Sequence, residues 1–154
     1  MRVLIVEDDE NKRDHLAVFL RGTLRDIVIE CAASYNSGVR KVIEFIPELI
    51  LLDMTLPTFD ITAREYGGAS ELYGGRDILE QMDYRDIHIP VIVLTQFDRF
   101  GDLDETITLE ELDRQLAREY GLSYKGAVYY DSAREGWKSS LKKKMLALNM
   151  WEER

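Results

Sequence analysis

Val3-Leu4-Ile5-Val6-Glu7-Asp8-Asp9 is the stretch of sequence that decides the fold. A short apolar run without polar alternation is typical of a strand that is buried on both faces of a parallel sheet. The acidic residues follow at the carboxyl end of that strand, which is where open α/β sheets bind their ligands. The stretch therefore predicts a buried strand with a binding site at its end.

Strands and helices alternate along the rest of the chain. The further predicted strands are Ile27–Ala33, Leu49–Leu52, Pro90–Leu94 and Ala127–Tyr130. The predicted helices are Asn11–Leu24, Ser34–Phe45, Arg76–Met82, one capped by Thr108 with Glu111, and a last helix with an apolar stripe of Trp137, Leu141, Met145, Leu148 and Trp151. This alternation favours an α/β fold in which a five-stranded parallel sheet carries helices on both faces.

The length of 154 residues suits one domain, residues 1–154. Residues 58–75 and 96–107 have no clear period, so we expect loop insertions there, at the edge of the sheet that holds the acidic residues. The net charge of −9 disfavours direct binding to nucleic acid or to an anionic membrane. No apolar stretch approaches the ~20 residues that cross a bilayer.

The N-terminus lacks the basic start and long apolar stretch of a signal peptide. The single cysteine excludes an internal disulfide and fits a reducing compartment. Both features predict a cytoplasmic protein.

Polar side chains follow several of the predicted strands. Glu7 and Asp8 follow the first strand, Asp53 follows the third and Thr95 ends the fourth. Carboxylates that meet at one edge of a sheet need a cation or a shared proton to offset their repulsion. Hard oxygen ligands of this kind suit Mg²⁺.

Three motifs in this order, Val3–Asp9, Leu51–Pro57 and Val91–Thr95, resemble the receiver domains of two-component response regulators. The resemblance extends over most of the chain, and it rests on the combination of the three motifs. It implies a flavodoxin-like sheet with the strand order 2-1-3-4-5.

The same resemblance implies a role for each matching residue. Asp53 would accept a phosphoryl group. Asp8 would bind Mg²⁺ directly, Glu7 would assist through water, and the backbone carbonyl of Thr55 would be a further ligand. The hydroxyl of Thr95 would contact the phosphoryl oxygens. An aromatic residue of the fifth strand, Tyr129 or Tyr130, would follow the movement of Thr95.

One part of the family pattern is missing. Receivers carry a lysine after the fifth strand, whereas this chain reads Tyr129-Tyr130-Asp131-Ser132. The loss of one preorganised charge-stabilising donor costs about 10²–10³ in rate. Other cations are poorly placed or expected at the surface, namely Lys125, Lys138, Arg64, Arg76 and Arg99.

Three hypotheses follow. The first is a stand-alone signalling receiver without enzymatic turnover, phosphorylated by a histidine kinase or a phosphotransfer protein and acting on a downstream effector protein. The second is an adaptor of the same fold that signals without phosphorylation. The third is a Mg²⁺-dependent phosphatase. Dehalogenase-like phosphatases carry an aspartate two residues after the nucleophile, and Thr55 at that position argues against this hypothesis. The last helix, with Trp137 and Trp151, could also pair two copies of the chain in a homodimer.

Overall fold

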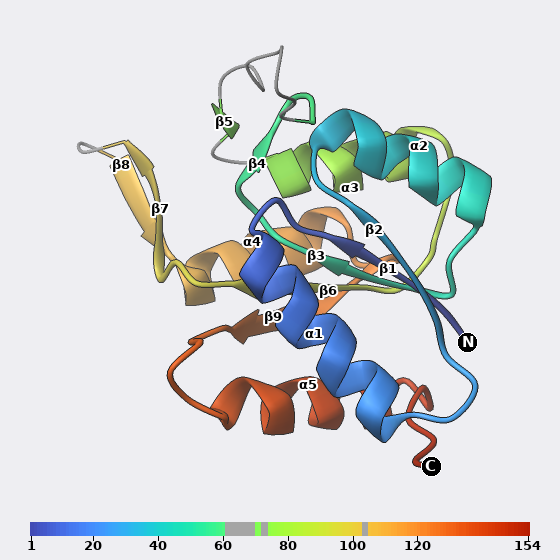
Figure 1. Ribbon diagram of the computed structural model, residues 1–154. Helices are drawn as coiled ribbons and strands as arrows, with labels where there is room; N and C mark the ends of the chain where they lie inside the picture. Colours follow the sequence, from blue (N-terminus) through green and yellow to red (C-terminus); the bar gives the residue numbers. More distant parts are fainter. Residues whose placement is uncertain (61–69, 72–73, 103–104) are drawn as a thin grey trace.

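The computed structural model describes residues 1–60, 70–71, 74–102 and 105–154. Five strands form the central parallel sheet (Figure 1): β1 (Arg2–Val6), β2 (Val28–Ala32), β3 (Leu49–Leu52), β6 (Val91–Thr95) and β9 (Tyr124–Tyr129). Their order is β2-β1-β3-β6-β9. The predicted order 2-1-3-4-5 is therefore confirmed, with β6 and β9 as its fourth and fifth strands.

Helices cover both faces of this sheet. They are α1 (Glu10–Thr23), α2 (Tyr35–Phe45), α3 (Gly74–Tyr84), α4 (Leu109–Glu119) and α5 (Gly136–Ala147). Helices α1 and α5 lie on one face, and α2, α3 and α4 lie on the other (Figure 1). None of the helices within the described residues has the length and apolar character needed to cross a membrane.

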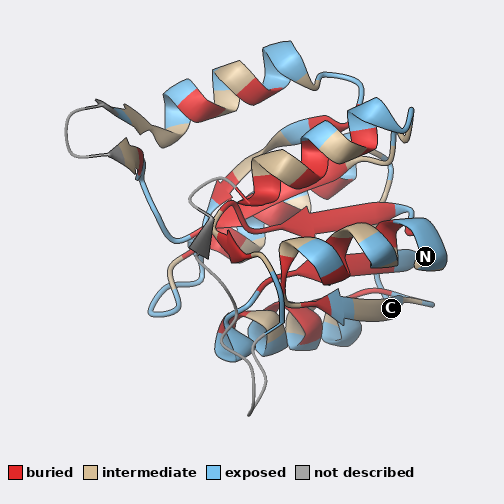
Figure 2. Ribbon diagram, turned by 90° about the horizontal axis from the view of Figure 1, so that it is seen from above, coloured by how far each residue is buried: buried red, intermediate tan, exposed pale blue. Residues whose placement is uncertain are grey.

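Successive residues of the inner strands enter opposite halves of the core. In β1, Leu4 and Val6 pack in the half formed with α2, α3 and α4, while Val3 and Ile5 pack in the half formed with α1 and α5. Seen from above, the inner strands β1, β3 and β6 are buried along their length, apart from Arg2 at the start of β1 (Figure 2). The continuous apolar runs in the sequence follow from this burial on both faces.

Side-chain caps start the helices that leave the sheet. The Asp9 carboxylate accepts hydrogen bonds from the amides of Asn11 and Lys12, and thereby starts α1 immediately after β1. The Thr108 side chain accepts a hydrogen bond from the amide of Glu111 at the start of α4, as predicted. Each cap satisfies amides that have no partner within the helix.

The last helix is shorter than its apolar stripe predicted. Helix α5 ends at Ala147, and Asn149 has a φ of 57°, which is the left-handed conformation that stops a helix. The chain then turns back, so the placement of Trp151 on this helix was wrong. The Trp151 ring lies outside the helix, with its centroid 6.0 Å from that of Phe19.

Two small antiparallel pairs occur within or directly beside the segments in which loop insertions were expected. β4 (Leu56–Pro57) pairs with β5 (Ser70–Glu71), and β7 (Arg99–Asp102) pairs with β8 (Glu105–Thr108). The β7–β8 pair projects from the body of the molecule (Figure 1). The prediction of irregular structure in 96–107 was thus wrong, because cross-strand pairing, which no local period reveals, orders this segment.

Candidate functional site

Three carboxylates meet at the carboxyl edge of the sheet. Glu7 and Asp8 follow β1, and Asp53 follows the neighbouring strand β3, in register because Val6 pairs with Leu52. One oxygen from each side chain lies within 4.8 Å of the others. The structure therefore brings together the acidic side chains that the sequence placed at separate strand ends.

Two of these carboxylates are buried and one is exposed. Glu7 is 2% exposed and Asp53 is 5% exposed, whereas Asp8 faces solvent. Burial, and then the nearby charge of Asp53, raises the pKa of Glu7 to about 8, although Lys12 opposes this rise. Burial also raises the pKa of Asp53, again against the effect of Lys12. The buried pair thus favours protonation, or a neighbouring cation, over two full negative charges.

Lys12 is the residue of this site that the sequence analysis missed. Its Nζ lies 2.6 Å from Glu7 Oε2 and 3.4 Å from Asp53 Oδ1. The same ammonium donates a hydrogen bond of 2.7 Å to the backbone carbonyl of Leu94, at the end of β6. Lys12 is only 2% exposed, and a buried ammonium is tolerated when its charge and its hydrogen bonds are satisfied in this way.

The helical period contained a signal for Lys12. Lys12, Leu16 and Leu20 are spaced by four residues, and all three are buried on the face of α1 that packs on the sheet. Residues four apart lie on the same face of a helix. A lysine one turn before an apolar stripe therefore points into the core, and at the start of α1 this direction leads to Glu7 and Asp53.

The ends of β6 and β9 complete the surroundings of Lys12. Thr95 is fully buried, and its hydroxyl oxygen accepts a hydrogen bond of 3.1 Å from the amide of Phe97. Tyr130 is buried with its ring centroid 5.5 Å from Lys12 Nζ, and its hydroxyl group lies 2.8 Å from Nδ1 of His15. Tyr129 is 51% exposed, so Tyr130 is the aromatic residue that faces the site.

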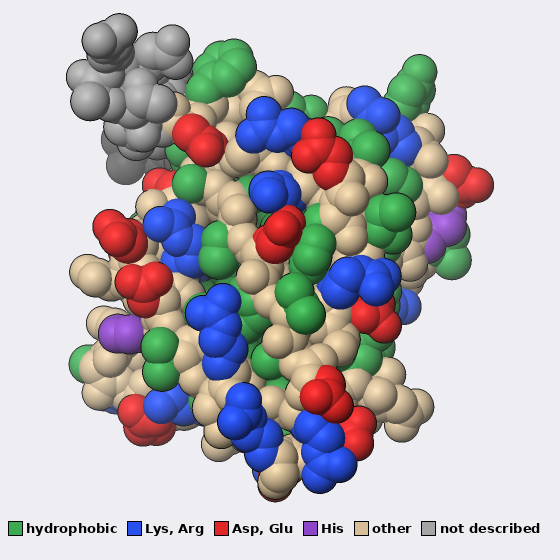
Figure 3. Space-filling model, turned by 45° about the vertical axis from the view of Figure 1, so that its right-hand side comes forward, with side chains coloured by type: hydrophobic (Ala, Val, Ile, Leu, Met, Phe, Trp, Pro, Cys, Tyr) green, Lys and Arg blue, Asp and Glu red, His purple; other side chains and the backbone are tan. Residues whose placement is uncertain are grey.

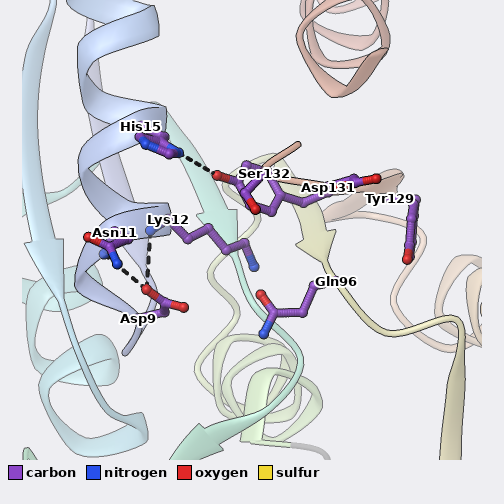
Figure 4. Close-up of a pocket in the computed structure, with 9 residues that line it drawn as sticks. Asp9, Asn11, Lys12, His15, Gln96, Tyr129, Asp131 and Ser132 are labelled. Carbon is purple, nitrogen blue, oxygen red and sulfur yellow. Dashed lines mark hydrogen bonds between the residues drawn. The ribbon is translucent and has the colours of Figure 1, made fainter. Parts of the chain in front are cut away.

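A cavity of about 400 Å³ opens beside Lys12, between α1 and the segments that follow β6 and β9 (Figure 4). The Lys12 side chain leaves α1 and crosses toward Gln96 (Figure 4). Lys12 lines this cavity and also contacts Asp53, so it stands at the boundary between the cavity and the carboxylates. Asp131 is engaged in its own turn, where its carboxylate accepts a hydrogen bond of 2.9 Å from the amide of Ala133.

The cations weighed from the sequence lie elsewhere. Arg76 pairs with Glu119 at 2.7 Å, and Arg99 is exposed on β7, as predicted. Lys138 pairs with Glu135 on α5. Arg64 lies outside the described residues. On the face shown in Figure 3, basic and acidic side chains are interspersed.

No protein-family model matches the chain. The chain is 32% identical over 151 residues to the uncharacterized protein y4jR of Sinorhizobium fredii, covering 97% of this chain and 99% of that protein. It is 29% identical over 150 residues to the Detocs response regulatory protein DtcB of Enterobacter cloacae, covering 96% and 100%. The structure of the response regulator domain of Thermotoga maritima CheB matches with a TM-score of 0.65 and 18% identity, over 97% of this chain and 96% of that domain.

The chain has the receiver fold of response regulators, and its sequence is similar to a response regulatory protein along nearly its whole length. Receivers are signalling modules of two-component systems. A further structural relative of this receiver is the Mn²⁺-bound form of the response regulator Rcp1, with a TM-score of 0.63, 19% identity and coverage of 99% and 98%. The acidic cluster of Glu7, Asp8 and Asp53 is a donor set that fits a divalent cation.

Proposed function

We propose that this receiver is a Mg²⁺-dependent phosphoacceptor whose acceptor residue is Asp53. The observation that carries the proposal is the meeting of Glu7, Asp8 and Asp53 oxygens within 4.8 Å at the ends of neighbouring strands. Carboxylate oxygens are the ligands that Mg²⁺ takes in phosphoryl-transfer sites, where it usually keeps several waters. Asp8 is exposed, so one of the three carboxylates is in direct contact with solvent.

Each residue of the site would have a separate task. Asp8 and Asp53 would bind Mg²⁺ directly, Glu7 would assist through water, and the backbone carbonyl of Thr55 would supply a further ligand. Mg²⁺ when bound would offset the repulsion between the carboxylate of Asp53 and an incoming phosphoryl group. An oxygen of Asp53 would form the new O–P bond while the N–P bond of a phosphohistidine in the donor breaks.

Thr95 would pass the change of charge to the surface. Its hydroxyl oxygen accepts a hydrogen bond from the amide of Phe97, in the segment that leads to the projecting β7–β8 pair. A turn of the Thr95 hydroxyl toward phosphoryl oxygens would break this bond and release the segment. The donor would be a histidine kinase or a phosphotransfer protein in the cytoplasm, and the output would be the binding of a downstream effector protein. We also propose that residues 1–154 act as one domain, into which 58–75 and 96–107 are inserted.

Labelling with acetyl phosphate and Mg²⁺, followed by intact mass measurement, tests this function. We expect one added phosphoryl group in the wild type and none in Asp53→Asn. Asp131→Asn is a matched control, because it removes a carboxylate at the same edge of the sheet that is engaged in its own turn. The proposal is refuted if the wild type shows neither labelling nor a response to beryllofluoride at millimolar concentration.

A phosphorylation-independent adaptor is the second candidate. The observation that favours it is the Lys12 ammonium, which already offsets the charge of Asp53 without any phosphoryl group. In that case Asp53→Ala would still recover the native partner in a pull-down, and the wild type would bind it without acetyl phosphate. Partner binding that requires acetyl phosphate would exclude this candidate.

A further inference from the structure

The site contains a cation, Lys12, although the lysine that receivers carry after the fifth strand is absent from this chain. Tyr130 directly follows β9, and the ammonium near Asp53 comes from Lys12 in the first turn of α1. The Tyr130 ring lies 5.5 Å from this ammonium. The cation near Asp53 therefore comes from α1, whereas the position directly after β9 holds an aromatic residue.

We propose that Lys12 is the phosphoryl-binding cation of this receiver, delivered by helix α1 in place of a lysine after β9. This inference rests on the proposed phosphorylation of Asp53. Lys12 Nζ lies 3.4 Å from Asp53 Oδ1, the nearest cation to this carboxylate among the described ion pairs. A preorganised positive charge at this position stabilises the charge that accumulates on the transferring group.

The contacts of Asp53 indicate which oxygen reacts. The Met54 amide donates a hydrogen bond of 2.9 Å to Oδ1, and Lys12 approaches the same oxygen. Both of these contacts engage Oδ1, and Glu7 is a further hydrogen-bonding neighbour of the carboxylate. We assign the other oxygen, Oδ2, to the new O–P bond. A phosphoryl group on Oδ2 would remain attached beside Oδ1, within reach of the flexible Lys12 side chain.

The contacts of Lys12 in the unmodified protein allow its ammonium to move to a phosphoryl group on Asp53. In the unmodified protein it is held by Glu7 Oε2 at 2.6 Å and by the Leu94 carbonyl at 2.7 Å. A phosphoryl group offers this ammonium a stronger charge-assisted partner than a carboxylate that is also needed by a divalent cation. Leu94 directly precedes Thr95, so a shift of Lys12 would loosen the end of β6 at the point where the switch residue lies.

The test measures beryllofluoride affinity in saturating Mg²⁺, with beryllofluoride as the phosphoryl mimic. We expect Lys12→Met to weaken this affinity ~10–100-fold, the range for a lost hydrogen bond to a charged group. Lys41→Met is the matched control, because Lys41 pairs with Glu30 at 3.1 Å on α2 and β2, and it should leave the affinity unchanged. The double variant Lys12→Met/Tyr130→Lys returns a cation from the β9 side and should recover ~10-fold or more of the loss.

A second readout separates a role in binding from a role in folding. Removal of the ammonium beside the carboxylates should strengthen Mg²⁺ binding ~10-fold when beryllofluoride is absent, because a repulsive charge is lost. A merely structural lysine would weaken both affinities together. Opposite changes in the two affinities therefore support the proposal, and a parallel loss overturns it.

Side-chain NMR on the wild type keeps the test independent of whether the variants fold. The lysine ammonium signal of Lys12, assigned with Lys12→Arg, should shift when beryllofluoride and Mg²⁺ are added. If the site amides respond and the Lys12 signal does not, the proposal is overturned while the function of Asp53 stands. The same holds if Lys12→Met is labelled by acetyl phosphate as fast as the wild type or faster. If the wild type does not respond at all, the proposed function itself fails.

Discussion

Replacement of Glu7 by glutamine should remove a large part of the pH dependence of stability. Burial raises the pKa of Glu7 from 4.5 to about 8 in the folded protein, so the folded state binds this proton more tightly than the unfolded state. The resulting stability is fully present below the unfolded pKa and is lost as the pH rises toward the folded one. The free energy of unfolding should therefore fall by about 1.4 kcal/mol per pH unit within this window, or about 2.5 kcal/mol between pH ~5.5 and ~7.5.

Urea denaturation without divalent cations measures this slope. Glu7→Gln has no titrating group at position 7. The change in its unfolding free energy over the same pH range should therefore be smaller than that of the wild type by about 2.5 kcal/mol. The exposed Glu44→Gln is the control and should keep the wild-type slope. Equal slopes in the wild type and in Glu7→Gln would refute the reasoning. Excess Mg²⁺ should stabilise the wild type more at the higher pH, where its ligands lose their protons, as followed by thermal melting.

Further predictions concern the packing that holds the site. A Cβ atom on Gly75 would clash with the backbone carbonyl oxygen of Asp53, so Gly75→Ala should cost about 1–3 kcal/mol of unfolding free energy in urea. Gly22→Ala, which meets nothing within 4 Å in α1, should instead stabilise by about 0.4–1 kcal/mol, and a loss of stability there would contradict the open space. The Tyr124 hydroxyl donates a hydrogen bond to Asp113 from a buried position, and Tyr124→Phe should cost about 1–3 kcal/mol, measured in the same way. A change below about 0.3 kcal/mol would contradict that bond.

The carboxylate side of the site could be predicted because it depends on strands alone. Parallel strands bring their carboxyl ends to one edge, so Glu7, Asp8 and Asp53 had to approach one another once β1 and β3 were neighbours. The cation could not be predicted in this way. Lys12 lies on a helix, and its ammonium reaches Asp53 only because of the position in which α1 packs on the sheet.

The sequence by itself determined the alternation of buried strands and amphipathic helices, the strand order through its motifs, and the acidic residues at the strand ends. The alternation and the acidic residues are local features, since they follow from the period of apolar residues and from the residue after each strand. The strand order was implied by the resemblance to receiver domains. Only the tertiary structure decided the burial of Glu7 and Asp53 and the source of the positive charge. Such features depend on which groups meet across elements far apart in the chain, as Lys12 and Leu94 do, and no spacing along a single segment specifies that contact.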